Sequence, residues 1–403
     1  MGKTVEPPRA FAILAIVPKR IAILGSTGSI GRNTLEVVEH LGGDFHAIAL
    51  SGHRQINELL EQVRKHRPKA VAITDRTGDI RVIEAIRQNV EVLYLGPQGL
   101  VDMVARDDVD MVVGAIVGAA GLPAVFATVR AGKPVALANK ESLVIAGSLL
   151  IPEARRRNVP ILPVDSEHSA VFQAIRCGRR EEIRKVILTA SGGPFRTASR
   201  EQMEKATLKD ALNHPTWRMG NKVTIDSATM FNKGLELIEA CWLFDLSPEQ
   251  VEVVVHPESI VHSMVEFVDG STVAQLSPPD MRTPIQYAIT YPDRLPGIGR
   301  TMDWRQRVAL NFEPPDLDRF PALRMAYEVA RTGGTSGAVM NAANEVAVEA
   351  FTTGKITFGE ISRTVELTIR AHRVQKSPSL DDLLQADRWA RAEAAKFVEG
   401  ENR

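Results

Sequence analysis

Cysteine is scarce in this sequence of 403 residues, and net charge is absent. Only Cys177 and Cys241 are present, and the formal net charge is +0 at pH 7. Two cysteines cannot form a disulfide framework, so we expect a reducing compartment, the cytoplasm. A neutral chain generates no global field that would attract nucleic acid or anionic membranes, so neither is expected as a partner.

The sequence also lacks a convincing membrane or export segment. The N-terminal apolar run from Phe11 to Val17 has seven residues, whereas a membrane-spanning helix needs about 20. Pro18-Lys19-Arg20 follows it instead of the small residues of a signal-peptide cleavage site. Residues 1–19 are therefore expected to form an N-terminal extension.

Short apolar runs that alternate with helical segments dominate the first 165 residues. They are Ile21–Leu24, 46–50, 70–74, 90–95, 111–117, 135–138 and 161–164. This alternation predicts an α/β fold with a Rossmann-like, doubly wound parallel sheet. Because 403 residues exceed one ordinary core, we predict further domains. The expected division is a cofactor domain (20–165), an α+β catalytic domain (166–290), a proline-rich linker (291–321) and a C-terminal helical bundle (322–403).

A glycine-rich turn directly follows the first apolar run. Gly25-Ser26-Thr27-Gly28-Ser29-Ile30-Gly31 leads into a helical segment from Asn33 to about His40, and such a turn cradles a phosphate. Its spacing differs from G-x-G-x-x-G, so an ordinary strand-to-helix turn stays an alternative. Gly52-His53-Arg54-Gln55 ends the second strand where an NAD site usually has an acid, and this basic pair favours NADP.

Two carboxylates, Asp165 and Glu167, follow the last apolar run of the first domain. If the strand continues through them, its alternation places both on one side. If residues 229–243 are helical, Asn232, Lys233 and Glu236 share a face, and Glu236 becomes a third oxygen ligand for Mg²⁺ or Mn²⁺. A surface acidic turn and a surface Lys–Glu pair are the alternatives.

Several loops and a hairpin carry further polar candidates. The turn at Ser191-Gly192-Gly193 offers a hydroxyl and free amides to an anion, or is simply a polar turn. The segment 212–220 contains His214 and Trp217 and suggests a lid; a Trp that anchors the loop to the core is the alternative. His262 lies in the first strand of a hairpin expected over 260–276, where a structural role is the commoner one. The C-terminal helices show capping signals at Thr357 and Ser379 but no catalytic group, so they are expected to brace the other domains.

Together these motifs resemble the 1-deoxy-D-xylulose 5-phosphate reductoisomerase family. The matching stretches, in family order, are GSTGSIG (25–31), AIVGAAGL (115–122), LANKESLV (137–144), VDSEHSA (164–170), TASGGPFR (189–196), HPTWRMG (214–220), TIDSATMFNKGLE (224–236), HPESIVHSMV (256–265), DMRTP (280–284) and NAANEVAV (341–348). The resemblance implies that NADPH and Mg²⁺ or Mn²⁺, with Co²⁺ possible, support the isomerisation and reduction of a phosphorylated ketose, 1-deoxy-D-xylulose 5-phosphate. The product would be 2-C-methyl-D-erythritol 4-phosphate, a step of the non-mevalonate isoprenoid pathway, and the enzyme would be a homodimer.

The resemblance also implies roles for individual residues. The implied metal ligands are Asp165, Glu167 and Glu236. The implied substrate contacts are Ser166, Ser191, His214, Trp217, Ser227, Asn232 and Lys233. The implied catalytic groups are Lys140, Glu167, His168 and His262. The implied cofactor contacts are Gly25, Ser26, Thr27, Gly28, Ser29, Ile30, Gly52, His53, Arg54, Gln55, Asn139, Glu141 and Gly220. An NADP-dependent dehydrogenase of another class, such as one acting on an amino-acid semialdehyde, and a catalytically silent NADP sensor are the alternatives.

Overall fold

The computed structural model describes residues 19–400. The expected N-terminal extension therefore lies outside the described residues, except for Lys19. This residue already belongs to the first strand, β1 (Lys19–Leu24). No helix within 19–400 is long and apolar enough to cross a membrane.

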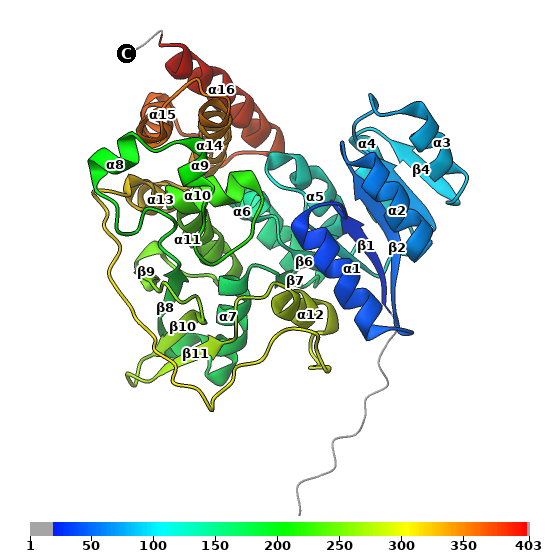
Figure 1. Ribbon diagram of the computed structural model, residues 1–403, viewed down its shortest axis with the longest axis horizontal. Coiled ribbons are helices and arrows are strands. Elements are labelled where there is room, and N and C mark those ends of the chain that lie inside the picture. The colour runs from blue at the N-terminus through cyan, green and yellow to red at the C-terminus, as the bar shows by residue number, and fades with distance from the viewer. Residues whose placement is uncertain (1–18, 401–403) are drawn as a thin grey trace, which may run out of the picture.

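A parallel sheet of seven strands forms the first part of the molecule and confirms the predicted fold class (Figure 1). The strand order is β4-β3-β2-β1-β5-β6-β7. The other strands are β2 (Phe45–Gly52), β3 (Ala70–Ile73), β4 (Val92–Leu95), β5 (Met111–Gly114), β6 (Val135–Leu137) and β7 (Ile161–Pro163). Because the order reverses between β1 and β5, the carboxyl ends of these two strands form the crevice where doubly wound folds bind ligands.

Helices cover both faces of this sheet. They are α1 (Ser29–Leu41), α2 (Ile56–His66), α3 (Ile80–Arg87), α4 (Gln98–Val104), α5 (Leu122–Arg130) and α6 (Lys140–Arg157). Much later in the chain, α12 (Arg282–Thr290) lies between α1 and α7 (Ser166–Ala174) (Figure 1). Its Ile285, Ala288 and Ile289 join the core of the parallel sheet. A segment from the middle of the chain thus helps to fix the first sheet.

A second sheet of four strands, in the order β11-β10-β8-β9, carries the central region. Its strands are β8 (Ile183–Ala190), β9 (Val251–Val255), β10 (Val261–Phe267) and β11 (Thr272–Leu276). The predicted hairpin is confirmed, because β10 and β11 pair antiparallel around a turn in which Gly270 has a φ of 85°. A positive φ of this kind is the reason that Asp-Gly favours such turns.

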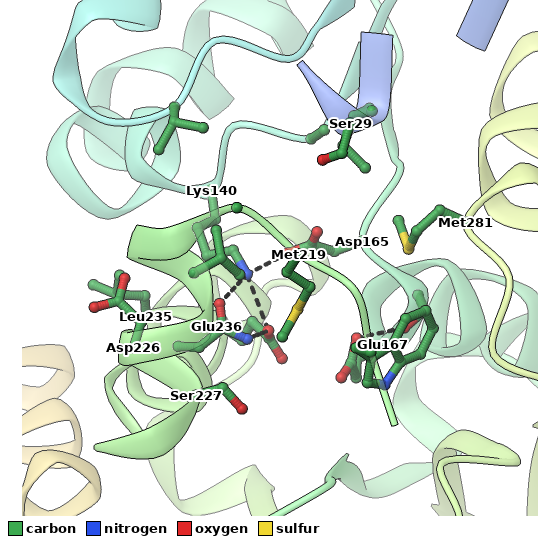
Figure 2. Close-up of a pocket in the computed structure, with 18 of the residues that line it drawn as sticks. Ser29, Lys140, Asp165, Glu167, Met219, Asp226, Ser227, Leu235, Glu236 and Met281 are labelled. Carbon is green, nitrogen blue, oxygen red and sulfur yellow. Dashed lines mark hydrogen bonds and ion pairs between the residues drawn. The ribbon is translucent and has the colours of Figure 1, made fainter. Parts of the chain in front are cut away.

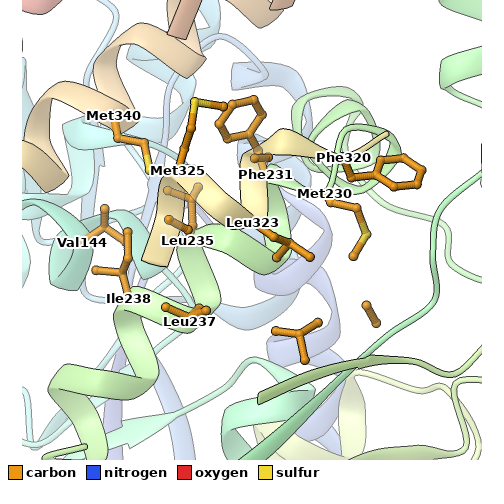
Figure 3. Close-up of a cluster of buried hydrophobic side chains, with 14 of the residues drawn as sticks. Val144, Met230, Phe231, Leu235, Leu237, Ile238, Phe320, Leu323, Met325 and Met340 are labelled. Carbon is orange, nitrogen blue, oxygen red and sulfur yellow. The ribbon is translucent and has the colours of Figure 1, made fainter. Parts of the chain in front are cut away.

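The helix α11 (Phe231–Phe244) lies at the centre of the largest core (Figure 3). Its Leu235 and Ile238 are buried in one cluster with side chains of α13 (Pro321–Thr332) and α14 (Ser336–Thr352). A Cβ at Gly234 would lie only 3.0 Å from Ala326 Cβ, so α11 and α13 pack closely. The C-terminal helices therefore position the helix that carries Glu236.

The proline-rich segment 291–320 contains neither a helix nor a named strand, and it runs along the surface (Figure 1). The predicted capping boxes are confirmed at Thr357–Glu360, before α15 (Phe358–Ala371), and at Ser379–Asp382, before α16 (Leu380–Glu399). The domain limits proposed from the sequence stay predictions.

Candidate active site

A cavity of about 290 Å³ opens at the carboxyl ends of the parallel strands (Figure 2). Five wall segments lie where strands end: 28–30 after β1, 115–117 after β5, Ala138, Lys140 and Glu141 after β6, 165–167 after β7, and 190–192 at the end of β8. The remaining walls come from the loop 214–220, from α10 (Asn221–Ala228) and α11, and from Met281. The cavity therefore lies at the junction of the two sheets.

Asp165 and Glu167 both line this cavity, but the strand alternation predicted for them is wrong. The strand β7 ends at Pro163, Asp165 is the N-cap residue of α7, and Glu167 lies in the first helical turn. The side chains converge because they flank a helix start, where the positive end of the helix dipole also favours carboxylates. The Ser166 hydroxyl donates a hydrogen bond of 2.7 Å to Glu167 Oε2.

The helical face predicted for Asn232, Lys233 and Glu236 is confirmed in α11. Met230 adopts the left-handed conformation, with a φ of 65°, and this residue separates α10 from α11. The bend lets α11 begin with its polar face toward the cavity and its apolar face in the core. Only 1% of Glu236 is exposed, so its charge needs partners inside the protein.

Two lysine ammonium groups supply these partners. Lys140 Nζ lies 2.6 Å from Asp165 Oδ2 and 3.0 Å from Glu236 Oε1, and it donates to Asn232 Oδ1 at 2.8 Å. Lys233 Nζ donates to Glu167 Oε1 at 2.8 Å and also to Glu236 Oε2. Lys140 thus links Asp165 to Glu236 (Figure 2). Lys233 links Glu236 to Glu167.

These pairs change the protonation equilibria of the cluster. Burial opposes the charged lysines, but the carboxylates of Asp165 and Glu236 hold the pKa of Lys140 well above its usual range. Burial also opposes ionisation of Glu167, yet the ammonium of Lys233 lowers the pKa of Glu167 to about 2. Burial raises the pKa of Asp165 to about 6, with Lys140 acting in the opposite direction. At neutral pH both carboxylates are ionised.

This donor set fits a hard divalent cation. Three carboxylates and the Asn232 amide reach one cavity, and oxygen ligands of this kind suit Mg²⁺ and Mn²⁺. Asp165 Oδ2 contacts Lys140 without a well-directed hydrogen bond, so it keeps unused acceptor capacity. The three carboxylates carry one more charge than the two lysines, which leaves the cluster attractive to a cation.

His168 and His262, predicted as catalytic groups, do not line the cavity. His168 is fully buried behind α11, where its Nε2 donates to the backbone carbonyl of Glu236 at 2.9 Å. Burial lowers the pKa of His168 to about 4, so the ring is neutral. His262 Nε2 lies 3.1 Å from the Ser277 carbonyl oxygen, and its ring centroid is 6.2 Å from that of Trp217. Both rings support cavity residues from behind.

A second group of buried ligand atoms lies beside His168. Asp165 Oδ2, His168 Nδ1 and Glu239 Oε2 make no hydrogen bond, and the candidate ligand atoms of these residues lie within 4.8 Å of one another. Burial and the neighbouring Asp165 carboxylate raise the pKa of Glu239 well above its usual range. Ionisation of Glu239 is therefore disfavoured in the fold. The cavity-facing set, in which three carboxylates reach one cavity, is the better candidate for a cation.

The Ser191 turn and the loop that contains Trp217 meet through His214. His214 Nδ1 accepts hydrogen bonds from the backbone N–H groups of Thr216 (3.1 Å) and Trp217 (2.9 Å). The proton of the neutral ring therefore lies on Nε2, which faces Ser191 Oγ at 2.9 Å. The expected lid is thus tied to a turn that lines the cavity, and Trp217 lines the cavity too.

Glycine geometry brings Ser227 to the same corner. Gly193 has a φ of 65°, and a Cβ there would lie 2.6 Å from the Ser227 carbonyl oxygen. Ser191, Ser227, Asn232 and Lys233 consequently line one end of the cavity. Two hydroxyls, an amide and an ammonium group form a site suited to a phosphate dianion.

The glycine turn after β1 has the shape of a phosphate cradle. Gly25 has a φ of 81°, and a Cβ there would lie 2.9 Å from the Ala115 carbonyl oxygen. A Cβ at Gly31 would lie 2.3 Å from the Gly25 carbonyl oxygen, so the turn and α1 approach as closely as only glycine allows. No side chain caps α1 at Gly28, which leaves its first amides free for an anion.

Not every residue predicted around this cradle faces the cavity. Gly28, Ser29, Ile30, Glu141 and Gly220 line it, whereas Gly25, Ser26, Thr27, Gly52, His53, Arg54, Gln55 and Asn139 do not. Ser26 Oγ is engaged with Gln62 Oε1 at 2.6 Å, inside the domain. Asn139 Nδ2 instead donates to the carbonyl oxygens of Ile116 and Gly118, at 2.5 and 2.9 Å.

The basic pair at the end of β2 remains available to a ligand. The Arg54 side chain is 82% exposed, and its Nε lies 3.5 Å from Asp75 Oδ2. His53 Nδ1 contacts Thr74 Oγ1 at 2.8 Å. An exposed guanidinium with one weak partner can turn toward a phosphate at little cost.

Sequence reasoning missed several residues of the cavity wall. They are Asn33, Arg218, Met219, Val223, Asp226 and Met281. Arg218, Met219, Asp226 and Met281 lie inside three of the matched motifs, 214–220, 224–236 and 280–284, and those motifs were the available signal. Asn33 and Val223 lie on α1 and α10, and whether they face the cavity depends on how these helices pack.

Comparisons with known proteins give a consistent result along the chain. Family models match at residues 21–147 (1-deoxy-D-xylulose 5-phosphate reductoisomerase), 161–244 (its C-terminal domain) and 276–393 (DXP reductoisomerase C-terminal domain). The 1-deoxy-D-xylulose 5-phosphate reductoisomerase of Trichlorobacter lovleyi is 50% identical over 377 residues, 93% of this chain and 96% of the relative. That of Heliobacterium modesticaldum is 51% identical over 387 residues, 96% of this chain and 98% of the relative.

Solved structures agree with these sequence relatives. A DOX-P reductoisomerase in complex with NADPH, fosmidomycin and magnesium superposes with a TM-score of 0.88 at 40% identity, covering 94% of this chain and 98% of that one. The enzyme from Zymomonas mobilis in complex with NADPH gives a TM-score of 0.86 at 44% identity, covering 95% and 99%.

Proposed function

Because the chain belongs to the 1-deoxy-D-xylulose 5-phosphate reductoisomerase family, we propose that its cavity is the site of that reaction. The enzyme converts 1-deoxy-D-xylulose 5-phosphate to 2-C-methyl-D-erythritol 4-phosphate and depends on NADPH and a divalent metal. The observation that supports this location best is the convergence of three carboxylates and two lysines beside the glycine cradle.

Asp165, Glu167 and Glu236 would hold the metal, which is magnesium or manganese, with cobalt a further option. Bound there, the ion supplies Lewis-acid stabilisation of negative charge on the ketone and hydroxyl oxygens of the substrate. Lys140 stays protonated at neutral pH, because its pKa is held high, and it adds a second positive charge beside the same oxygens.

The phosphate group of the substrate would lie at the corner formed by Ser191, Ser227, Asn232 and Lys233. Lys233 already lies there as an ammonium group, and the neighbouring hydroxyls and amide supply directed hydrogen bonds. Binding at this remote group fixes the reacting carbons relative to the metal ligands. His214 and Trp217 would close the loop over the bound substrate and exclude water.

Glu167, together with Ser166, would transfer protons at the reacting hydroxyls of the substrate. Glu167 remains a carboxylate at neutral pH because of its low pKa, so it can accept a proton or orient a hydroxyl. His168 and His262 are assigned supporting positions instead, since neither lines the cavity.

NADPH would extend from the cradle at 25–31 into the cavity. The free amides at the start of α1 suit its pyrophosphate, and Glu141 and Gly220 lie along the cavity wall. Arg54 and His53 stand at the neighbouring strand end, where the 2′-phosphate is recognised in this class of fold. Bound there, NADPH would supply the hydride for the reduction.

The test follows NADPH absorbance with 1-deoxy-D-xylulose 5-phosphate after removal of bound metal with EDTA. We expect oxidation only when both the substrate and Mg²⁺ or Mn²⁺ are supplied. NADPH binding without oxidation under either metal would refute the proposal. A reaction that proceeds in excess EDTA would refute the metal dependence alone.

We also propose that the enzyme is a cytoplasmic homodimer. Both cysteines are free, and β11 leaves one edge of its sheet unpaired within the described chain. The side chains of Val268 and Trp304 are 65% and 68% exposed, which suits a contact surface. Light scattering should give twice the 44.1 kDa chain mass; a single chain mass at micromolar concentration would contradict the dimer.

A further inference from the structure

The helix α14 carries polar residues that point out of the C-terminal bundle toward the cavity walls. Asn341 and Asn344 are fully buried in the described structure, and the Glu345 side chain is 17% exposed. In Figure 1, α14 lies between α16 and α10. Burying an amide or a carboxylate costs free energy unless the group is hydrogen-bonded. The partners of these side chains therefore indicate what this helix does.

Glu345 holds the loop that follows β5. Its Oε1 accepts a hydrogen bond from the Ala119 backbone N–H at 3.2 Å. Its Oε2 accepts from Arg391 Nη2 at 2.6 Å, and Asn341 Nδ2 donates to Oε1 at 3.0 Å. The carboxylate is thus fixed on the side of α14 and α16 and reaches across to a backbone amide of the cofactor domain.

The loop is shaped to admit this carboxylate. Gly118 has a φ of 78°, and a Cβ there would lie 2.7 Å from Glu345 Oε1. The same loop lines the cavity with Ala115, Ile116 and Val117. It also contacts the glycine cradle, because the Ala115 carbonyl oxygen lies against Gly25. Glu345 therefore fixes, from behind, the wall that stands between the cradle and the cavity.

Asn344 acts in the same way on a second wall of the cavity. Its Nδ2 donates to Asp226 Oδ1 at 2.8 Å, and Asp226 lines the cavity from α10. Lys222 Nζ bridges Asp226 Oδ2 at 2.8 Å and Glu141 Oε1 at 3.2 Å. An amide turned the other way would present its oxygen to the Asp226 carboxylate, so the contact requires the donor end of asparagine.

We propose that Glu345 and Asn344 are positioning residues that make the C-terminal helices part of the active site. Glu345 sets the cofactor wall at 115–119, and Asn344 sets α10, which directly follows the loop 212–220. Adjacent residues on one turn of α14 thereby fix two walls of the cavity. This inference rests on the proposed function, since it assigns NADPH to the wall that Glu345 holds.

The first test measures NADPH affinity by fluorescence, without substrate or metal. Glu345→Ala should raise the dissociation constant of NADPH roughly tenfold or more, because a hydrogen bond to a charged group contributes at least about that factor. Glu345→Gln keeps an acceptor for the Ala119 amide and should recover most of the affinity. Glu349→Ala is the matched control, because Glu349 is exposed one turn further along the same helix.

A second variant removes the donor instead of the acceptor. Ala119 begins a short 3₁₀ turn, a position that tolerates proline, so Ala119→Pro deletes the N–H with little change of fold. It should weaken NADPH binding as Glu345→Ala does, and the double variant should be no weaker than either single one. Thermal unfolding checks that each variant folds. Affinities within about twofold of wild type, or additive losses in the double variant, would overturn the Glu345 assignment.

The test of Asn344 measures substrate kinetics. Asn344→Asp places two carboxylates together, so it should raise the KM for 1-deoxy-D-xylulose 5-phosphate roughly tenfold, with NADPH affinity within about twofold of wild type. An unchanged KM would overturn this assignment. If wild-type protein does not bind NADPH, the proposed function fails first. If wild type binds and the variants match it, only this inference fails.

Discussion

Replacing Glu236 by glutamine tests whether the cavity-facing carboxylates form the metal site. Glu236 accepts hydrogen bonds from Lys140, Asn232 and Lys233, and only 1% of it is exposed. Glutamine preserves the shape but removes one negative charge. Three carboxylates and two ammonium groups give a net charge of −1, which becomes zero in Glu236→Gln.

The magnitude follows from electrostatics inside the protein. At an effective dielectric constant of about 20, two unit charges about 4 Å apart interact by about 4 kcal/mol. In Glu236→Gln, a divalent ion in direct contact with this side chain would lose at least that much attraction. We therefore expect metal affinity to fall roughly 1000-fold. Removing one partner of a buried pair also destabilises the fold by about 3 kcal/mol.

The assay combines three measurements on purified variant and wild type. Electron paramagnetic resonance of free Mn²⁺ gives metal affinity, fluorescence gives NADPH affinity, and NADPH oxidation gives turnover. We expect Glu236→Gln to bind NADPH normally, to bind Mn²⁺ far more weakly, and to turn over little at low metal concentration. Normal turnover at low Mg²⁺ would remove Glu236 from the site.

The neighbouring acid Glu239 provides the matched control. It lies one turn further along α11 and is equally buried, but it does not line the cavity. Because burial raises its pKa and disfavours its ionisation, Glu239→Gln changes the charge beside the cavity less than Glu236→Gln does. Its Mn²⁺ affinity should stay within about threefold of wild type. If both variants lost metal equally, the ligand set would instead include the buried group around His168.

Three further predictions address the cofactor, the loop and the pH dependence. Arg54→Glu should raise the KM for NADPH roughly tenfold and leave that for NADH unchanged; equal effects in steady-state assays with both cofactors would place Arg54 away from the 2′-phosphate. Trp217→Ala should lower kcat/KM for 1-deoxy-D-xylulose 5-phosphate roughly tenfold without changing NADPH affinity, and unchanged kinetics would leave Trp217 without a lid role. His168 keeps its proton off in the fold until about pH 4, whereas the unfolded chain binds one below about pH 6.5. Its contribution to stability is therefore complete above pH 6.5 and is lost as the pH falls toward 4, by about 3 kcal/mol. Urea unfolding of His168→Gln should show a flatter pH profile over that range, and a profile parallel to wild type would contradict this.

Local sequence patterns predicted the helices and the hairpin well, because interactions between residues close in sequence determine these elements. The helical period alone placed Asn232, Lys233 and Glu236 on one face of α11, and the Asp-Gly turn alone placed the hairpin. Asp165 and Glu167 reach one cavity as expected, but through a helix N-terminus and not through strand alternation. Periodicity could not distinguish these two geometries, because a two-residue spacing at a strand end fits both.

The errors and omissions concern contacts between distant parts of the chain. Whether His168 faces the cavity or the core depends on α11 packing over it, 68 positions later in sequence. The contact of Asn344 with Asp226 spans 118 positions, and that of Glu345 with Ala119 spans 226. Sequence reasoning therefore interpreted the C-terminal helices only as a brace. When two residues in contact lie this far apart in sequence, the burial and direction of their side chains follow from tertiary packing. No local sequence pattern encodes that packing.

The two lysines explain how a site with three converging carboxylates can fold before any metal binds. Like charges brought together in a buried cavity repel one another, and without compensation one of them would become protonated. Lys140 comes from α6, beside the parallel sheet, and Lys233 comes from α11, so the compensating charges arrive from two elements. Each ammonium group bridges two carboxylates and holds them at the cavity. The same lysines are the groups assigned to the oxygens and the phosphate of the substrate. The same pair of charges therefore stabilises the cluster of carboxylates and binds the substrate. Replacing either lysine by methionine should impair both the stability of the fold and substrate binding.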